Sequence, residues 1–299
     1  SARMSADEPT PRRARWSEIK AALEMAGFQP SRKLGQNFLV DENMLRAIVR
    51  DAKVAEGDFV LEIGPGAGVL TAQLVAAGGR VLAVEIDERL ADFAREFLGE
   101  ERVQWLVRDA LESKHELAPE LVAALPASAP WKLVSNLPYS AGTPILAAVA
   151  RLANPPQSCT VLLQKDLAVR LAARPGGREW GAISGRLQAV YSVEHRRDLG
   201  PQLFWPRPQV DSSLLVMELR RERPTPAELV ELDRLLDVLF QQRRKTVRNR
   251  LVDFFDSSEL ALAACEAAGI DPQLRPEDVP VEPWVAVVRW AARRAAGSA

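Results

Sequence analysis

The sequence predicts a doubly wound, mostly parallel α/β sheet followed by a smaller all-helical C-terminal domain. In the first part of the chain, short apolar runs typical of buried parallel strands alternate with segments of helical periodicity. After about Arg223 the strand pattern ends, and apolar residues recur only at helical spacing. A chain of 299 residues is long enough for one α/β core and one small accessory domain.

Each strand is predicted from a short apolar run, and each helix from apolar residues three or four positions apart. The predicted strands are Phe59–Ile63, Val81–Ile86, Val103–Val107, Lys132–Ser135, Thr160–Leu163, Val190–His195 and Ser213–Leu219. The first helices are expected over Val69–Ala77, Glu88–Leu98 and Thr143–Leu152. After Pro224, leucines recur at helical spacing. We therefore expect a flexible extension over residues 1–16, an α/β domain over 17–222 and a helical domain over 223–299.

Composition excludes several classes of protein. With 47% hydrophobic and 26% charged residues, the chain is neither disordered nor fibrous. No apolar stretch approaches the roughly 18 residues of a membrane helix, and the polar N-terminus lacks the apolar core of a signal peptide, so we expect a cytoplasmic protein. Cys159 and Cys265 are isolated, and there are only two histidines, which argues against disulfides, a metal site and serine–histidine catalysis.

The charge balance gives no global sign of nucleic-acid binding. The chain has 39 Lys and Arg against 40 Asp and Glu, for a net charge of −1. Binding to RNA or DNA would therefore depend on local patches. The densest candidate is the segment 243–250, which carries five basic residues and no acidic one. On composition alone, this segment is equally well the solvated face of a helix.

A glycine-rich segment falls where the first predicted strand ends and a helix begins. In Glu62-Ile63-Gly64-Pro65-Gly66-Ala67-Gly68, glycines permit a tight turn and close approach of the backbone to a ligand. The following helix N-terminus supplies free N–H donors. A dinucleotide fingerprint has its third glycine one position later, where Val69 stands. The segment therefore indicates a ligand loop of another kind, or an ordinary strand-to-helix turn.

Polar side chains follow three further strands at their carboxyl ends, where open α/β sheets bind ligands. Glu85 comes 21 residues after Gly64 and can accept both hydroxyl hydrogens of a ribose. Asp109 closes the third strand and Asn136 the fourth. Each alone is compatible with a strand-end turn. Together they outline one cleft.

The segment Asn136-Leu137-Pro138-Tyr139 indicates the reaction. The exocyclic amine of adenine is a poor nucleophile, because its lone pair is delocalised into the ring. Two acceptors, Asn136 Oδ1 and the Leu137 carbonyl, can hold its N–H groups and aim the lone pair at an electrophilic methyl. Tyr139 can stack on a base that has left its helix. No strong general base is needed, because the nitrogen becomes acidic once it is alkylated.

With these motifs, nearly the whole chain resembles the small-subunit ribosomal RNA adenine N6,N6-dimethyltransferases. The matching motifs are, in order, Leu34–Asp41, Glu62–Gly68, Glu85, Asp109, Asn136–Tyr139, Phe204–Ser212 and Gln242–Asn249. The resemblance implies a Rossmann-like methyltransferase fold and S-adenosylmethionine as cofactor, with S-adenosylhomocysteine as product. It also implies dimethylation of two adjacent adenosines near the 3′ end of the small-subunit RNA, during late subunit biogenesis.

The resemblance further assigns site residues. Cofactor binding falls to Asn37, Leu39, Gly64, Gly66, Glu85, Asp109 and Asn136, with Glu85 on the ribose and Asp109 on the adenine ring of the cofactor. Catalysis falls to Asn136, Leu137, Pro138, Tyr139 and Phe204, with the two aromatic rings gripping the flipped adenine. Phosphates of the RNA would meet Arg243, Arg244, Lys245 and Arg248.

Three other interpretations are compatible with parts of the sequence. The large-subunit adenine methyltransferases that confer macrolide resistance share the cofactor motifs and the aromatic turn, although the Phe204–Ser212 and Gln242–Asn249 motifs favour the small-subunit family. A ribosome-assembly checkpoint factor with secondary catalysis is the second. A nicotinamide oxidoreductase is the third, and the glycine spacing counts against it. We expect a monomer that binds the small ribosomal subunit and its RNA, and neither a membrane nor a metal.

Overall fold

The computed structural model describes residues 15–31, 34–99 and 101–297. Among these residues, seven strands form the main sheet in the order β4-β3-β2-β7-β8-β11-β9. The strands are β2 (Phe59–Ile63), β3 (Arg80–Glu85), β4 (Val103–Val107), β7 (Lys132–Asn136), β8 (Ser158–Gln164), β9 (Tyr191–Leu199) and β11 (Ser212–Leu219). The first five in chain order pair in parallel, while β11 lies antiparallel between β8 and β9. Every predicted strand is confirmed, although β9 extends four residues beyond its predicted end.

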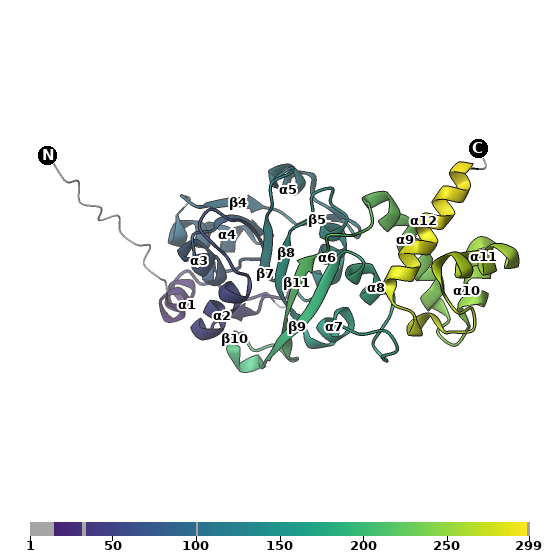
Figure 1. The fold of residues 1–299 in the computed structure, drawn as a ribbon. Coiled ribbons are helices and arrows are strands. Elements are labelled where there is room, and N and C mark those ends of the chain that lie inside the picture. The colour runs from purple at the N-terminus through teal and green to yellow at the C-terminus, as the bar shows by residue number, and fades with distance from the viewer. Residues whose placement is uncertain (1–14, 32–33, 100, 298–299) are drawn as a thin grey trace.

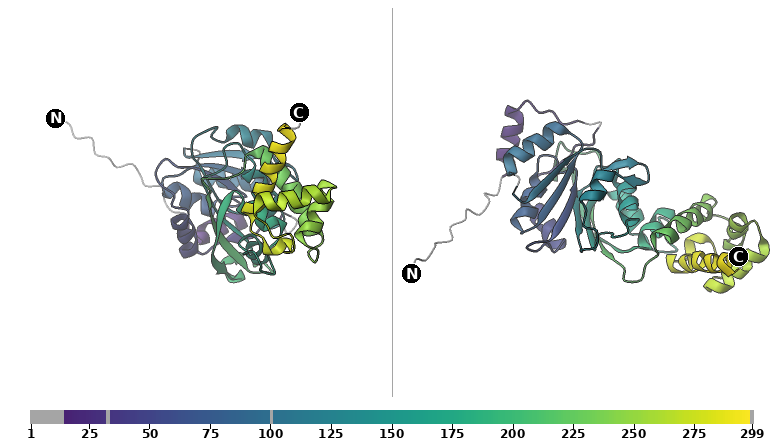
Figure 2. Two further views of the ribbon diagram at one scale, coloured as in Figure 1. Left: turned by 45° about the vertical axis from the view of Figure 1, so that its right-hand side comes forward. Right: turned by 90° about the horizontal axis from the view of Figure 1, so that it is seen from above.

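Helices cover both faces of this sheet (Figures 1 and 2). They are α2 (Glu42–Asp51), α3 (Val69–Ala76), α4 (Glu88–Leu98), α5 (Pro119–Ala124), α6 (Gly142–Ala150), α7 (Lys165–Leu171) and α8 (Ala182–Gln188). Alternate residues of each central strand face opposite cores, since side chains along a strand alternate in direction. Leu61 packs in the core with α5 and α6, whereas Val60 packs in the core with α2, α3 and α4. Strands buried on both faces explain the continuous apolar runs in the sequence.

Several short elements were not predicted. Helix α1 (Trp16–Met25) precedes the sheet, and β5 (Leu111–Ser113) pairs with β6 (Glu116–Leu117). Strand β1 (Phe38–Leu39) pairs with β10 (Phe204–Trp205), which the 3₁₀ turn η1 (Pro201–Leu203) precedes. This pairing joins two motifs that lie far apart in the sequence. Of the predicted N-terminal extension, residues 1–14 lie outside the described part of the chain.

The chain after β11 is helical, as predicted. It contains α9 (Pro226–Gln241), α10 (Val247–Phe255), α11 (Ser258–Ala268), the 3₁₀ turn η2 (Pro276–Asp278) and α12 (Val281–Gly297). Thr225 caps α9 by accepting a hydrogen bond from the Glu228 N–H. The helical part lies at one end of the molecule in Figure 1.

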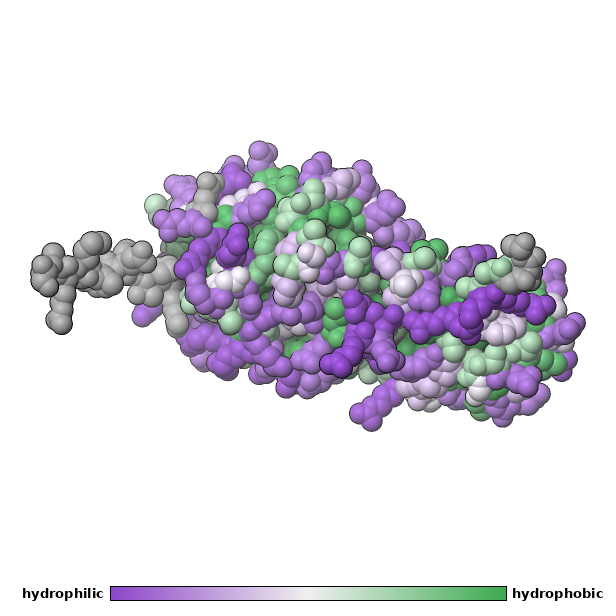
Figure 3. All heavy atoms as spheres, turned by 45° about the horizontal axis from the view of Figure 1, so that its top comes forward, coloured by the Kyte–Doolittle hydropathy of each residue, from purple (hydrophilic) through white to green (hydrophobic). Residues whose placement is uncertain are grey.

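The helical part is joined to the α/β part by both apolar and charged contacts. One apolar core runs without a break from the sheet into α9–α12. Asp233 of α9 accepts from Arg151 and from Arg186, and Arg186 also reaches Asp237 at 2.9 Å. On the face drawn in Figure 3, a hydrophilic band crosses this junction. Within the described residues, no helix combines the length and the apolar character needed to cross a membrane.

Candidate active site

A cavity opens at the carboxyl ends of β2, β3, β4 and β7. Of the predicted cofactor and catalytic residues, those that line it are Asn37, Leu39, Gly64, Gly66, Glu85, Asp109, Asn136, Leu137, Pro138 and Tyr139. Phe204 is not among the lining residues. Residues at the ends of β2, β3 and β7, residues that follow β4, and the N-terminal segment 34–39 therefore meet in one place, as the position of polar residues at strand ends predicted.

The glycine-rich loop is shaped by left-handed backbone conformations. Gly64, Gly66 and Gly68 have φ of 72°, 56° and 81°, a region that residues other than glycine rarely adopt. A Cβ atom on Gly66 would lie 2.5 Å from Cε1 of Phe38. Gly68 is the N-cap of α3, which explains why the third glycine comes earlier than in a dinucleotide fingerprint. The loop can thus bring its backbone close to a ligand.

Glu85 is held rigidly at the end of β3. Only 4% of it is exposed, and its two carboxylate oxygens accept hydrogen bonds from the Gly66 and Asp87 N–H groups, each at 2.9 Å. Burial raises the pKa of Glu85, although both backbone hydrogen bonds act to lower it. Each oxygen keeps a further lone pair, so the carboxylate can accept hydroxyl hydrogens from a bound sugar.

The Asn136 amide is oriented by the N-terminal segment. Its Nδ2 donates to the Asn37 carbonyl at 2.9 Å, and Asn37 Nδ2 donates to the Gly35 carbonyl at 3.2 Å. Because a carbonyl can only accept, this bond assigns the amide NH₂ to the Asn37 side and leaves Asn136 Oδ1 to act as an acceptor elsewhere. The backbone is fixed as well, since Leu137 N–H donates to the Leu162 carbonyl at 3.2 Å.

The two predicted aromatic residues differ in position. Tyr139 lines the cavity, and its hydroxyl lies 2.7 Å from Ser212 Oγ, which anchors the end of the ring. Burial raises its pKa, so it remains a neutral phenol near neutral pH. Phe204 is only 3% exposed and lies in the core beside β1. The structure therefore brings Tyr139 to the cavity but leaves Phe204 beneath its wall.

Two polar groups of the cavity wall were not predicted individually. Glu62 is 1% exposed and accepts from Thr71 Oγ1 at 2.6 Å, and burial raises its pKa to about 8. Gln36 donates to Asp87 at 3.0 Å. Both residues lie within motifs of the sequence, Glu62–Gly68 and Leu34–Asp41, but residue type alone does not indicate their hydrogen-bond partners. Asp109 is exposed and caps its own turn by accepting from the Leu111 N–H at 2.9 Å.

The basic segment is only partly available to a ligand. Arg244, Lys245 and Arg248 are exposed, with Arg248 donating to Ser258 Oγ at 3.0 Å. Arg243 instead donates to Glu277 at 3.0 Å and to the carbonyls of Arg178 and Trp180, each at 2.9 Å. It therefore ties the loop after α9 to the loop before α8.

Arg250, the fifth basic residue of the segment 243–250, is not available to a ligand. It is 2% exposed, donates twice to the Val238 carbonyl and pairs with Asp253. In α10 it lies three residues after buried Val247 and next to buried Leu251, so the helical period turns it inward.

Within the described ranges, no three His, Cys, Asp or Glu residues are grouped as metal ligands would be.

The profile of the ribosomal RNA adenine dimethylase family matches residues 27–293. The chain belongs to this family. Ribosomal RNA small subunit methyltransferase A of Streptomyces griseus is 38% identical over 273 residues, covering 91% of this chain and 92% of that protein. The protein of the same name from Lactobacillus helveticus is 35% identical over 266 residues, covering 86% and 90%.

Solved structures agree with membership of the family. The 23S rRNA methyltransferase ErmE has a TM-score of 0.63 and 25% identity, covering 84% of this chain and 98% of that one. A dimethyladenosine transferase from Plasmodium falciparum has a TM-score of 0.70 at 18% identity, covering 85% and 97%, and shows the shared fold. The expected family, enzyme class and Rossmann-like methyltransferase fold are confirmed.

Proposed function

We propose that this enzyme transfers methyl groups from S-adenosylmethionine to N6 of two adjacent adenosines near the 3′ end of the small-subunit ribosomal RNA, giving N6,N6-dimethyladenosine. The observation that carries the proposal is the oriented amide of Asn136, which stands in the same cavity as the buried carboxylate of Glu85. The names of the curated relatives support the small subunit as the target. Such a reaction belongs to ribosome assembly in the cytoplasm.

The cavity residues fit S-adenosylmethionine. Glu85 offers a fixed acceptor for ribose hydroxyls, and the glycine loop lets backbone groups approach without obstruction. We assign the methionine part to Asn37, Leu39 and Gly64, and the adenine ring to Asp109. Gly66 and Asn136 are the other residues that we assign to cofactor binding. When bound, the cofactor supplies an electrophilic methyl group and leaves as S-adenosylhomocysteine.

The chain's own groups would act on the target adenine. Asn136 Oδ1 and the Leu137 carbonyl would accept its two N–H hydrogens and shift the nitrogen toward tetrahedral geometry. Pro138 keeps the segment rigid, and the Tyr139 ring, anchored through Ser212, offers a stacking surface. Phe204 would join this grip only by emerging from beneath the cavity wall, because its ring is buried.

The RNA would be positioned by the exposed basic residues of the helical part. Arg244, Lys245 and Arg248 are the available phosphate ligands, with Arg243 acting through the loops that it joins. Phosphate contacts orient a substrate without reading its sequence, so the shape of the subunit would supply specificity. We also propose that the enzyme works as a monomer and without a metal.

Methylation of the large subunit is the competing proposal, because the 23S rRNA methyltransferase ErmE shares the fold at 25% identity. The deciding experiment measures transfer of labelled methyl from S-adenosylmethionine to unmodified small subunits, large subunits and duplex DNA, with nucleoside analysis of the products. We expect dimethyladenosine in the small-subunit RNA alone. Label in the large subunit would favour the competing proposal. Tight binding to small subunits without label would make the chain an assembly checkpoint factor.

A further inference from the structure

The segment 34–37 crosses the cavity and is fastened to it at two adjacent residues. Gln36 is bonded to Asp87, which follows β3, and the carbonyl of Asn37 accepts from Asn136, which ends β7. All four residues of the segment line the cavity. One dipeptide therefore joins the side of the cavity that holds Glu85 to the side that holds Asn136.

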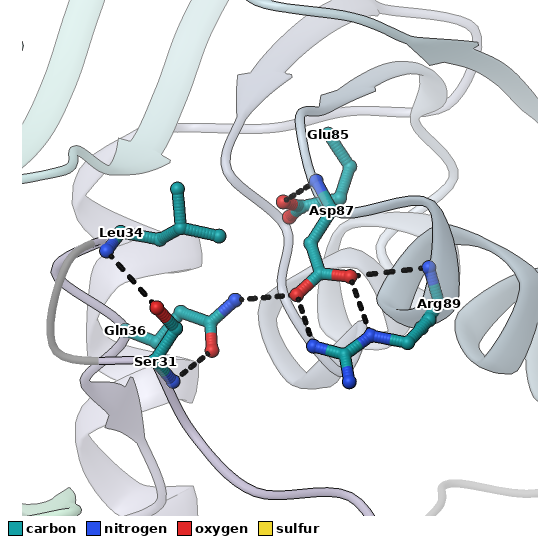
Figure 4. Close-up of polar contacts among 6 residues, drawn as sticks. All are labelled: Ser31, Leu34, Gln36, Glu85, Asp87 and Arg89. Carbon is teal, nitrogen blue, oxygen red and sulfur yellow. Dashed lines mark hydrogen bonds and ion pairs between the residues drawn. The ribbon is translucent and has the colours of Figure 1, made fainter.

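The Gln36 side chain uses both ends of its amide. Its Oε1 accepts from the Ser31 N–H at 2.6 Å, while its Nε2 donates to Asp87 Oδ2 at 3.0 Å (Figure 4). Its own N–H donates to the Ser31 carbonyl at 3.2 Å. Because the oxygen is committed to an N–H donor, the NH₂ group must face the carboxylate. Glutamate cannot reproduce this arrangement when ionised, and alanine removes it.

Asp87 carries this contact on to Glu85. Its backbone N–H donates to Glu85 Oε1 at 2.9 Å, and its carboxylate caps α4 through the Arg89 N–H at 3.1 Å. The Arg89 guanidinium also donates to both oxygens of that carboxylate, each at 3.3 Å. Burial raises the pKa of Asp87, but hydrogen bonds from Arg89 and Gln36 outweigh it and leave that pKa below its usual value. Asp87 is thus an ionised acceptor near neutral pH.

We propose that Gln36 is a positioning residue that couples the binding of the cofactor at Glu85 to the orientation of the Asn136 amide. The inference rests on the proposed function for the identity of the cofactor. It goes beyond it, because Gln36 acts through Asp87 on one side and through the Asn37 backbone on the other. Loss of Gln36 should therefore affect affinity and the transfer step together.

The first test is Gln36→Ala. We expect S-adenosylmethionine to bind about tenfold more weakly by calorimetry, since a hydrogen bond to a charged group is lost. We expect the transfer rate at saturating cofactor to fall about tenfold as well, because the Asn37 carbonyl no longer fixes Asn136. Gln104→Ala, on the exposed side of edge strand β4, is the matched control and should change neither quantity. A change in affinity alone would overturn the coupling.

The second test is Gln36→Glu, measured from pH 8 to pH 5.5. At pH 8 the new carboxylate at position 36 and the carboxylate of Asp87 would both be ionised and would repel each other, so the contact would break. Glu85 and Arg89 are the neighbouring charged groups. At lower pH a shared proton restores a hydrogen bond. We expect the affinity of Gln36→Glu relative to the unsubstituted protein to rise about fivefold or more over this range. A ratio that stays constant and equal to that of Gln36→Ala would contradict the proposed contact.

Hydrogen exchange without cofactor separates this inference from the proposed function. We expect faster exchange of the backbone amides of residues 34–39 in Gln36→Ala than in the unsubstituted protein. Equal exchange would contradict the fastening of the segment, whatever the protein binds. Failure of the unsubstituted protein to bind S-adenosylmethionine, with exchange altered as expected, would instead reject the proposed function and with it the coupling.

Discussion

At the scale of single residues, we expect substitution of Asn136 to affect mainly catalysis and substitution of Glu85 to affect mainly cofactor binding. Asn136→Ala removes the oriented acceptor, and we expect methyl transfer to fall about a hundredfold or more. Cofactor affinity should fall much less than the transfer rate. Glu85→Ala removes a buried carboxylate held by two backbone N–H groups, and we expect mainly weaker cofactor binding. Calorimetric titration and single-turnover transfer measure the two quantities. A near-normal turnover of Asn136→Ala would show that the amide does not hold the target nitrogen.

Glu62 makes the stability of the protein depend on pH. Its pKa is about 8 in the folded protein against 4.5 ordinarily, so the folded state holds a proton that the unfolded state releases between these values. Stability from this group is fully present below pH 4.5 and is lost as pH rises toward 8. We expect Glu62→Gln to remove this loss, which is at most about 1.4 kcal/mol per pH unit. Urea unfolding at pH 5, 6.5 and 8 measures it, and parallel pH profiles for both proteins would contradict it.

At the scale of elements, the glycine-rich loop depends on its packing against β1. Gly66→Ala meets both a left-handed backbone and the Phe38 ring, which Phe28 and Trp205 hold in place. Gly57→Ala is the matched control, because Gly57 has φ of 82° but open space around it. We expect the control to cost about 1–2 kcal/mol and Gly66→Ala to cost more and to weaken cofactor binding. Equal losses in thermal unfolding would mean that the ring moves aside.

Some elements could be predicted from the sequence and others could not. The central strands β2, β3, β7, β8 and β11 were found because burial on both faces makes each a mostly apolar run. The edge strands β4 and β9 are more exposed, and only part of β9 was predicted. Polar residues at or just after the strand ends located Glu85, Asp109 and Asn136. The β1–β10 pair was missed because two-residue strands carry no periodic signal. In that pair Leu39 lies opposite Phe204, whose side chain is buried. Hydrogen-bond partners such as Gln36 and Asp87 depend on tertiary contacts that spacing does not encode.

At the scale of the whole molecule, function depends on where charge is left unpaired. The chain has a net charge of −1, so general attraction to RNA is absent. Composition placed five basic residues in one segment, but the fold turns Arg250 inward and commits Arg243 to the junction with the α/β part. The burial of Arg250 could have been predicted from the helical periodicity of α10, because Val247 and Leu251 lie on the same buried face. The commitment of Arg243 rests on loops that meet only in the folded chain.

Exposed Arg244 and Lys245 should therefore carry much of the salt dependence of binding to the small subunit. Each phosphate neutralised contributes about 0.7–0.9 to the slope of log K against log salt. We expect Arg244→Ala with Lys245→Ala to reduce that slope by about 1.4–1.8. The control, Arg234→Ala with Arg293→Ala, removes the same charge from exposed positions elsewhere on the helical part and should leave the slope unchanged. Equal slopes for both double variants would show that these cations act only through net charge, and that Arg244 and Lys245 are solvated residues of the loop between α9 and α10.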